Sequence, residues 1–128
     1  MVAFYSPGEA VRRSGLSLDT LRYYERIGLL DRVARDHSGR RRFDERDLTW
    51  LRVLVCLRET GMPIVRMRRY AELVRDGEDT LAERVDLLSE HDARVEEQIK
   101  TLLAQREHLR KKIAGYRETL AAREEAHQ

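Results

Sequence analysis

The sequence predicts an all-α protein with one small β-hairpin, in which a helix-turn-helix domain over residues 1–76 is followed by a long helix over residues 77–128. Three observations predict this fold. Capping residues and glycines divide the first part into short helices, and a turn cluster separates two of them. A heptad repeat without proline fills the last part.

The first two helices are predicted from residues that begin and end helices. Ser6, with Glu9 three positions later, is a capping-box pattern, and Pro7 suits the first helical position. Ser17 can cap a second helix after a short turn, and Gly28 suits the left-handed position that ends it. Two helices joined by such a short turn form a helix-turn-helix motif.

The second of these helices carries an arginine followed by two tyrosines. The polar ends of Arg22, Tyr23 and Tyr24 can all reach phosphate, and the tyrosine rings can also pack against sugar or base. This combination favours a helix laid on DNA over a helix folded into a core.

The charge distribution separates two parts of the chain, although the net charge of the whole is only +2. Residues 1–70 hold 15 Lys and Arg against 9 Asp and Glu, a net of +6. Residues 71–128 hold 10 against 14, a net of −4. The basic N-terminal part is therefore expected to face phosphates.

The segment between the second and third helices predicts a β-hairpin, or wing. Residues 36–39 are a turn cluster between two short segments. The returning segment carries three consecutive arginines, which suit phosphates or a minor groove: Arg40, Arg41 and Arg42. The alternative is a solvated basic loop, but the neighbouring helix-turn-helix favours contact with DNA.

Two further helices are predicted after the hairpin. Asp44 can cap the third helix, which ends near Thr60 before Gly61. Most of its circumference is expected to be buried, so Trp50 is expected in the core rather than on a binding surface. The fourth helix begins around Pro63, and its arginines are either solvated or close to phosphates.

The last part reads as one long helix that opens with a second capping box, Thr80 with Glu83. About 40 residues at 1.5 Å each extend about 60 Å, and a lone helix of that length cannot bury an apolar seam. A second copy of the chain is its natural partner. The predicted dimerisation residues recur in steps of three and four: Leu81, Val85, Leu88, Val95, Ile99, Leu102, Leu109 and Ile113, with Tyr116 and Leu120 continuing the pattern.

Two polar residues, Asp92 and Arg106, occupy positions of this seam, seven residues on either side of Ile99. In an antiparallel pair of helices centred near Ile99, Asp92 of one chain would lie close to Arg106 of the other. A polar pair in a seam fixes register and orientation at some cost in stability. The alternative is that the two are unrelated surface charges.

Several classes of protein are excluded by composition. Cys56 is the single cysteine, which rules out an internal disulfide framework and any cysteine-rich metal site. The histidines at positions 91, 108 and 127 lie too far apart for a compact metal site, so no cofactor is expected. The sequence contains no nucleophile–base pairing and no phosphate loop, which argues against an enzyme. Without a membrane-spanning run or signal peptide, it is expected in the cytoplasm and away from membranes.

These motifs together resemble the MerR family of transcriptional regulators over essentially the whole chain. The N-terminal motif is specific to that family among helix-turn-helix proteins. The segments that carry the resemblance are residues 5–10, the TLRYYERIGLL stretch at 20–30, residues 39–43, 47–48 and 57–64, and the long helix.

The resemblance implies a winged helix-turn-helix domain and a homodimer joined by an antiparallel coiled coil. It implies that the dimer binds double-stranded DNA within a promoter spacer that is too long for RNA polymerase, and bends and untwists it so that the promoter elements realign. The DNA-binding residues that follow are Arg22, Tyr23 and Tyr24 on the second helix, Arg41 on the wing, and Ser17 and Thr20 as further contacts.

The chain departs from the family pattern at the wing. Phe43 stands where the family usually has tyrosine, so a hydroxyl-to-phosphate bond is lost there. A proline common after Leu30 is missing, and Arg32 lies near that place.

The inducer is the least determined feature. Family members usually carry a sensor after the coiled coil, whereas this chain ends almost where the coiled coil does. Cys56 resembles the single cysteine of a subgroup proposed to sense aldehydes or other electrophiles. Three alternatives stay open. Cys56 can be a small buried hydrophobe, the trigger can be a small apolar ligand between the DNA-binding domain and the partner's coiled coil, or the chain can be a coiled-coil adaptor that binds proteins.

Overall fold

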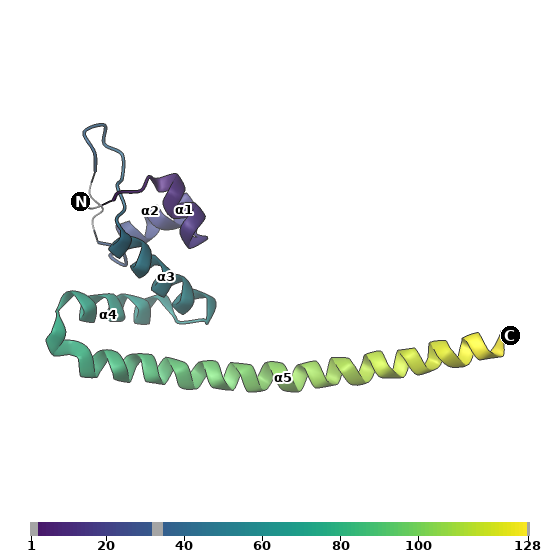
Figure 1. The fold of residues 1–128 in the computed structure, drawn as a ribbon. Helices are drawn as coiled ribbons and strands as arrows, with labels where there is room; N and C mark the ends of the chain where they lie inside the picture. The colour runs from purple at the N-terminus through teal and green to yellow at the C-terminus, as the bar shows by residue number, and fades with distance from the viewer. Residues whose placement is uncertain (1–2, 32–34, 128) are drawn as a thin grey trace. The chain divides into compact units, whose positions relative to one another are not determined.

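The computed structural model describes residues 3–31 and 35–127, and Arg32 of the sequence analysis lies outside them. The described residues form five α-helices and one short 3₁₀ turn (Figure 1). The chain divides into two compact units, residues 1–89 and residues 90–128. The elements are α1 (Pro7–Ser14), α2 (Leu18–Arg26), α3 (Glu45–Glu59), α4 (Ile64–Arg75), η1 (Glu78–Thr80) and α5 (Leu81–Ala126).

The predicted starts of α1 and α2 are confirmed by their caps. The Ser6 hydroxyl accepts from the Glu9 backbone N–H at 3.2 Å, and the Ser17 hydroxyl accepts from that of Thr20 at 3.1 Å. The first cap is only half of the expected capping box, because the Glu9 carboxylate accepts from Arg12 instead. Gly28, with φ of 83°, ends the α2 region in the left-handed conformation, as predicted.

Helix α3 begins with a complete capping box. The Asp44 carboxylate accepts from the Asp47 backbone N–H at 2.9 Å, and the Asp47 carboxylate accepts from that of Asp44 at 3.0 Å. Both backbone donors at the start of the helix are thereby satisfied, a contribution of about 1 kcal/mol for such a cap. The prediction that Asp44 begins the helix is confirmed.

The second predicted capping box, at Thr80 and Glu83, is wrong. The Thr80 hydroxyl donates to the Leu73 carbonyl oxygen at 2.6 Å, and Glu83 pairs with Arg69 at 3.2 Å. The reason is that η1 runs directly into α5, so the backbone is already helical at Thr80. Its hydroxyl then closes the end of α4 instead of opening α5.

The core of the first unit is formed by leucines of α2, α3 and the segment after α2, together with Phe43 and Met67. Each fully buried side chain of this size contributes roughly 1.5–3 kcal/mol through removal from water. Trp50 packs against this core, donates its indole N–H to the Leu29 carbonyl oxygen at 2.7 Å and stacks on Tyr70. Its expected role as a packing residue is confirmed.

The turn predicted at residues 36–39 is present. The Asp36 carboxylate accepts from the backbone N–H groups of Ser38 and Arg40, both at 2.9 Å, and Gly39 has φ of 80°. Both hydrogen bonds lower the pKa of Asp36, and the bond from the Arg40 backbone has the larger effect. Within residues 35–43 the strand pairing is limited to one isolated bridge, Arg35 with Arg41, and Phe43 pairs instead with Tyr5. Because Asp44 already caps the next helix, the returning segment has only four residues.

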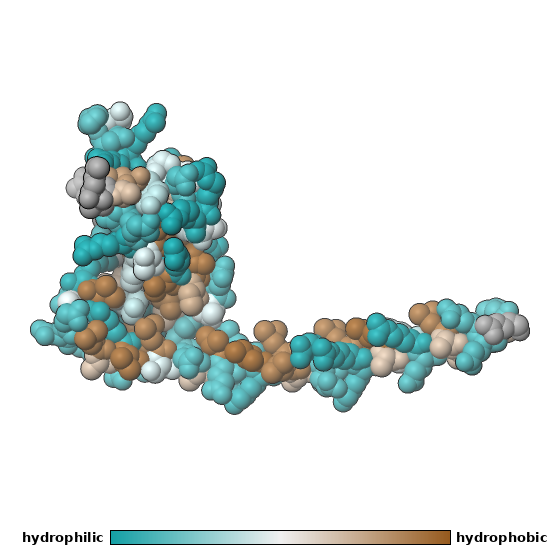
Figure 2. Space-filling model, in the orientation of Figure 1, coloured by the Kyte–Doolittle hydropathy of each residue, from teal (hydrophilic) through white to brown (hydrophobic). Residues whose placement is uncertain are grey.

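Helix α5 is one continuous helix of 46 residues. Leu87 is buried and Leu88 packs against the core of the first unit, which explains why that unit extends past residue 76. Beyond them the apolar side chains are largely exposed, Leu102 at 70% and Leu109 at 64%. Figure 2 shows hydrophobic patches, in brown, recurring along α5 between hydrophilic ones, in teal. In the part of the chain that the structure describes, no helix is long and apolar enough to cross a membrane.

Candidate nucleic-acid interface

Helix α2 divides its residues between the core and the solvent. Leu21 is fully buried and Tyr24 is 3% exposed, so this face anchors the helix. Arg22, Tyr23 and Arg26 lie on the exposed face, and the Arg26 guanidinium stands 5.3 Å from the centre of the Tyr23 ring. The packing of one face thus fixes the direction in which the two arginines and the tyrosine project.

Tyr24 requires a correction to the view that three equivalent side chains face outward. Its ring belongs to the core, packed in the same cluster as Leu21 and Leu29. Among the described residues every buried side-chain nitrogen or oxygen atom has a hydrogen-bond partner, and the Tyr24 hydroxyl is not one of the bonded groups. The hydroxyl oxygen of Tyr24 therefore keeps a small exposed surface, whereas the residue as a whole is buried.

The start of α2 presents two hydroxyls close together. Ser17 is exposed, Thr20 is half-buried, and their side-chain oxygens lie 2.9 Å apart. A helix N-terminus offers backbone N–H groups and a favourable dipole to a phosphate. Asp19, 96% exposed, adds one negative charge to this turn, and Arg22 lies 3.9 Å from it.

A basic hollow lies beside α2. Its lining consists of Arg22, Glu25, Arg26 and Arg41. The Glu25 carboxylate accepts from the Arg41 Nε at 2.8 Å and lies 3.6 Å from the Arg35 guanidinium. Several guanidinium groups thus surround a single carboxylate, and the hollow keeps a net positive charge that suits a phosphate.

The three consecutive arginines of the returning segment are not equivalent. Arg40 is exposed, and its backbone rather than its side chain is held by the turn. The Arg41 side chain is only 18% exposed because it pairs with Glu25. The Arg42 guanidinium lies 3.8 Å from the centre of the Phe4 ring. Of these three arginines, Arg40 has a side chain without a hydrogen bond or ion pair in the described residues, and Arg41 joins the returning segment to α2.

Arg26 was missed in the sequence analysis, although a signal existed. It follows Arg22 by four positions, and residues four apart share one face of a helix. The role of Glu25 had no such signal, because its partner Arg41 is sixteen residues away and the two meet only in the folded chain.

Helices α1 and α3 are fastened by a polar cluster next to this region. The Tyr5 hydroxyl donates to the Glu45 carboxylate at 2.6 Å, and Arg13 lies 3.3 Å from the same oxygen. The hydrogen bond from Tyr5, followed by the charge of Arg13, lowers the pKa of Glu45. The cluster holds the first helix of the helix-turn-helix against α3.

Cys56 is exposed on α3, which makes the interpretation as a buried hydrophobe wrong for the single chain. Its carbonyl oxygen accepts from the Thr60 hydroxyl at 2.6 Å at the end of that helix. In the described residues there is no group of three or more His, Cys, Asp or Glu side chains able to hold a metal ion.

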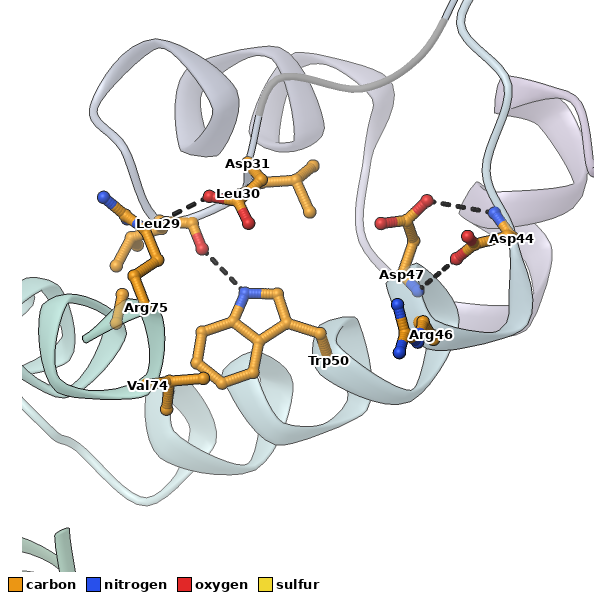
Figure 3. A pocket seen from close by; sticks show the side chains of 10 residues that line it. Leu29, Leu30, Asp31, Asp44, Arg46, Asp47, Trp50, Val74 and Arg75 are labelled. Carbon is orange, nitrogen blue, oxygen red and sulfur yellow. Dashed lines mark hydrogen bonds and ion pairs between the residues drawn. The ribbon is translucent and has the colours of Figure 1, made fainter. Parts of the chain in front are cut away.

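A separate cavity of about 310 Å³ lies between α3, α4 and the segment after α2 (Figure 3). The Trp50 indole N–H points toward Leu29, and Arg75 lies beside Leu29, paired with Asp31 at 3.1 Å. Burial raises the pKa of Asp47 in its wall. The ion pair of Arg75 with Asp31 joins α4 to the segment after α2, and the Asp44–Asp47 bonds close the start of α3.

Family models match two overlapping parts of the chain. The model of MerR helix-turn-helix family regulatory proteins covers residues 5–73, and the model described as MerR, DNA binding covers residues 48–112. The chain belongs to the MerR family. The expected resemblance is confirmed.

Relatives described as transcriptional regulators support the same assignment. A transcriptional regulator of Haemophilus influenzae is 39% identical over 117 residues, which cover 91% of this chain and 87% of that protein. The regulator AdhR of Bacillus subtilis is 36% identical over 87 residues, covering 68% of this chain and 62% of AdhR. These proteins are transcriptional regulators and not enzymes, in agreement with the prediction from sequence.

Solved structures of MerR proteins share the fold. HiNmlR, a MerR family regulator that lacks the sensor domain and was solved bound to promoter DNA, is 39% identical with a TM-score of 0.84, covering 93% of this chain and 94% of HiNmlR. A MerR family protein of Listeria monocytogenes is 37% identical with a TM-score of 0.81, covering 88% of this chain and 85% of that one.

Proposed function

We propose that this MerR protein is a homodimeric transcriptional regulator that binds a palindromic operator within a promoter spacer and activates by bending and untwisting that spacer. The observation that carries the proposal is the exposed basic face of α2, with Arg22, Tyr23 and Arg26 projecting from a helix anchored in the core. The binding of promoter DNA by HiNmlR supports it.

The DNA contacts follow from this face. Arg22 and Tyr23 reach the phosphates from α2, joined by Ser17 and Thr20 at its start and by the Tyr24 hydroxyl at its edge. Residues 35–43 act as the wing, where Arg40 meets the backbone directly. Arg41 and Arg42 shape and charge the wing through their contacts with Glu25 and Phe4.

The homodimer forms through an antiparallel coiled coil of α5, since its exposed apolar residues need a partner of the same length. Two copies of α2 related by a two-fold axis explain why the operator is a palindrome. In the cytoplasm, RNA polymerase then recognises promoter elements that the distorted DNA has brought into alignment.

The trigger that we propose is modification of the Cys56 thiol by an electrophile. Its exposure on α3 supports this assignment, because a reagent must reach the sulfur. A small non-covalent ligand is the alternative, and transcription by a Cys56→Ser variant separates the two.

Operator binding measured by fluorescence anisotropy at several salt concentrations tests the proposal. Arg22→Ala is expected to weaken binding by roughly tenfold and to lower the salt dependence by about one phosphate contact. Arg94→Ala, which removes an exposed arginine of α5, is the matched control and should bind normally. Unchanged binding by both variants would remove α2 from the interface.

A further inference from the structure

Asp92 and Arg106 have no ionic partner available on their own helix. Residues three and four positions from Asp92 are Leu88, Ser89, Val95 and Glu96, and those around Arg106 are three leucines and Arg110. Both side chains are exposed, and neither takes part in an ion pair or hydrogen bond within the described chain. Lys100, by contrast, finds Glu97 at 3.5 Å one turn away.

Asp92 and Arg106 each have a residue of the same charge four positions later in the sequence. Asp92 with Glu96 forms an acidic pair, and Arg106 with Arg110 forms a basic pair, all four exposed. Like charges at this spacing destabilise a single helix. Glu96 is partly compensated by Lys100, 4.0 Å away on the same helix. Asp92 and Arg106 gain an opposite charge when an acidic pair meets a basic pair on another helix.

We propose that the acidic pair of one chain binds the basic pair of its partner, twice by symmetry, and that these contacts set the register and antiparallel orientation of the dimer. The inference rests on the homodimer of the proposed function and specifies how its two α5 helices align. The occupant of the exposed seam is a second copy of this chain.

The apolar seam independently selects the same register. An antiparallel pair centred on Ile99 would place only five of the twelve seam positions opposite another seam position. Sliding one helix by three residues, about 4.5 Å, pairs all twelve. The layers are then Leu81 with Leu120, Val85 with Tyr116, Leu88 with Ile113, Asp92 with Leu109, Val95 with Arg106 and Ile99 with Leu102.

In this register the charged pairs meet without further adjustment. Asp92 faces Leu109 of the partner, so the partner's Arg106 and Arg110 lie within one helical turn of it. Glu96 lies next to the partner's Arg106. The exposed leucines and isoleucine between them, with Ile99 at 52% and Leu102 at 70%, become the dry centre of the dimer. The register that we propose is centred between Ile99 and Leu102.

Charge reversal tests the orientation, with the association state of the full chain measured by analytical ultracentrifugation. The Asp92→Arg/Glu96→Arg variant and the Arg106→Glu/Arg110→Glu variant should each raise the dimer dissociation constant by about two orders of magnitude. A chain with all four reversals should dimerise like wild type and should not exchange subunits with it. Ready exchange would show a parallel pair and overturn the proposal.

Cross-linking tests the register. In the Cys56→Ser background, Ile99→Cys chains mixed with Leu102→Cys chains should form a disulfide between the two, since Cα atoms must lie within about 7 Å. Preferential linking of Ile99→Cys to itself would overturn the shifted register. A monomeric wild type would refute the proposed homodimer. A wild-type dimer that tolerates both double reversals would refute only the charged contacts.

Discussion

At the scale of residues, the interface depends on which side chains the fold leaves free. Tyr23 and Tyr24 are adjacent and identical in type, yet the first is 41% exposed and the second 3%. The helical repeat explains the difference, because Tyr24 shares the face of Leu21 three positions earlier. A purely local interpretation assigned both rings to DNA, whereas the periodicity of the same helix assigns one to the core.

Two substitutions of Tyr24 separate its ring from its hydroxyl. Tyr24→Phe keeps the buried ring, so thermal stability should stay close to wild type while operator affinity falls by a few-fold through loss of one phosphate contact. Tyr24→Ala empties the core and should cost about 3–5 kcal/mol of unfolding free energy. Chemical denaturation and anisotropy on the same samples measure both effects, and undiminished affinity of Tyr24→Phe would limit Tyr24 to packing.

At the scale of elements, the helix starts were predictable where the signal was local. Ser17 and Asp44 cap the helices that follow them, since a cap needs only the next three residues. The cap predicted at Thr80 does not form, because the Thr80 hydroxyl donates to the Leu73 carbonyl oxygen of the preceding helix. The ion pair of Glu25 with Arg41 was equally beyond a local interpretation, because tertiary packing brings the two together.

The Tyr5, Arg13 and Glu45 cluster joins α1 to α3 and should make their packing pH-dependent. The pKa of Glu45 is lowered in the folded state from an ordinary value of 4.5. The folded chain therefore binds this proton less readily than the unfolded chain, so the stabilisation is present above that value and is lost as the pH falls below it.

Glu45→Gln should accordingly flatten the fall in unfolding free energy below about pH 4.5. Glu59→Gln, on the same helix and also exposed, is the matched control and should leave the fall unchanged. Urea unfolding between pH 3 and pH 6 makes the comparison. Parallel curves for wild type and Glu45→Gln would show that the cluster does not contribute to stability.

At the scale of the whole molecule, DNA contact and dimerisation act together only if the distance between the two copies of α2 is fixed. In the dimer that we propose, the α5 register supplies that constraint, because sliding one helix by three residues would move its attachment by about 4.5 Å. A dimer of defined span can impose a deformation on the DNA instead of following it, which would be the physical basis of the activation by untwisting that we propose.

Transcription in vitro tests this mechanism and its trigger together. On a promoter with an over-long spacer, wild type treated with a reactive aldehyde should activate, whereas Cys56→Ser should bind the operator without responding.

Shortening the spacer to the length that RNA polymerase prefers should make the promoter active alone, and the activated dimer should then repress it, because the same untwisting now misaligns the promoter elements. Activation on both spacers would point to recruitment of polymerase by contact. A response that survives Cys56→Ser would assign the trigger to a non-covalent ligand.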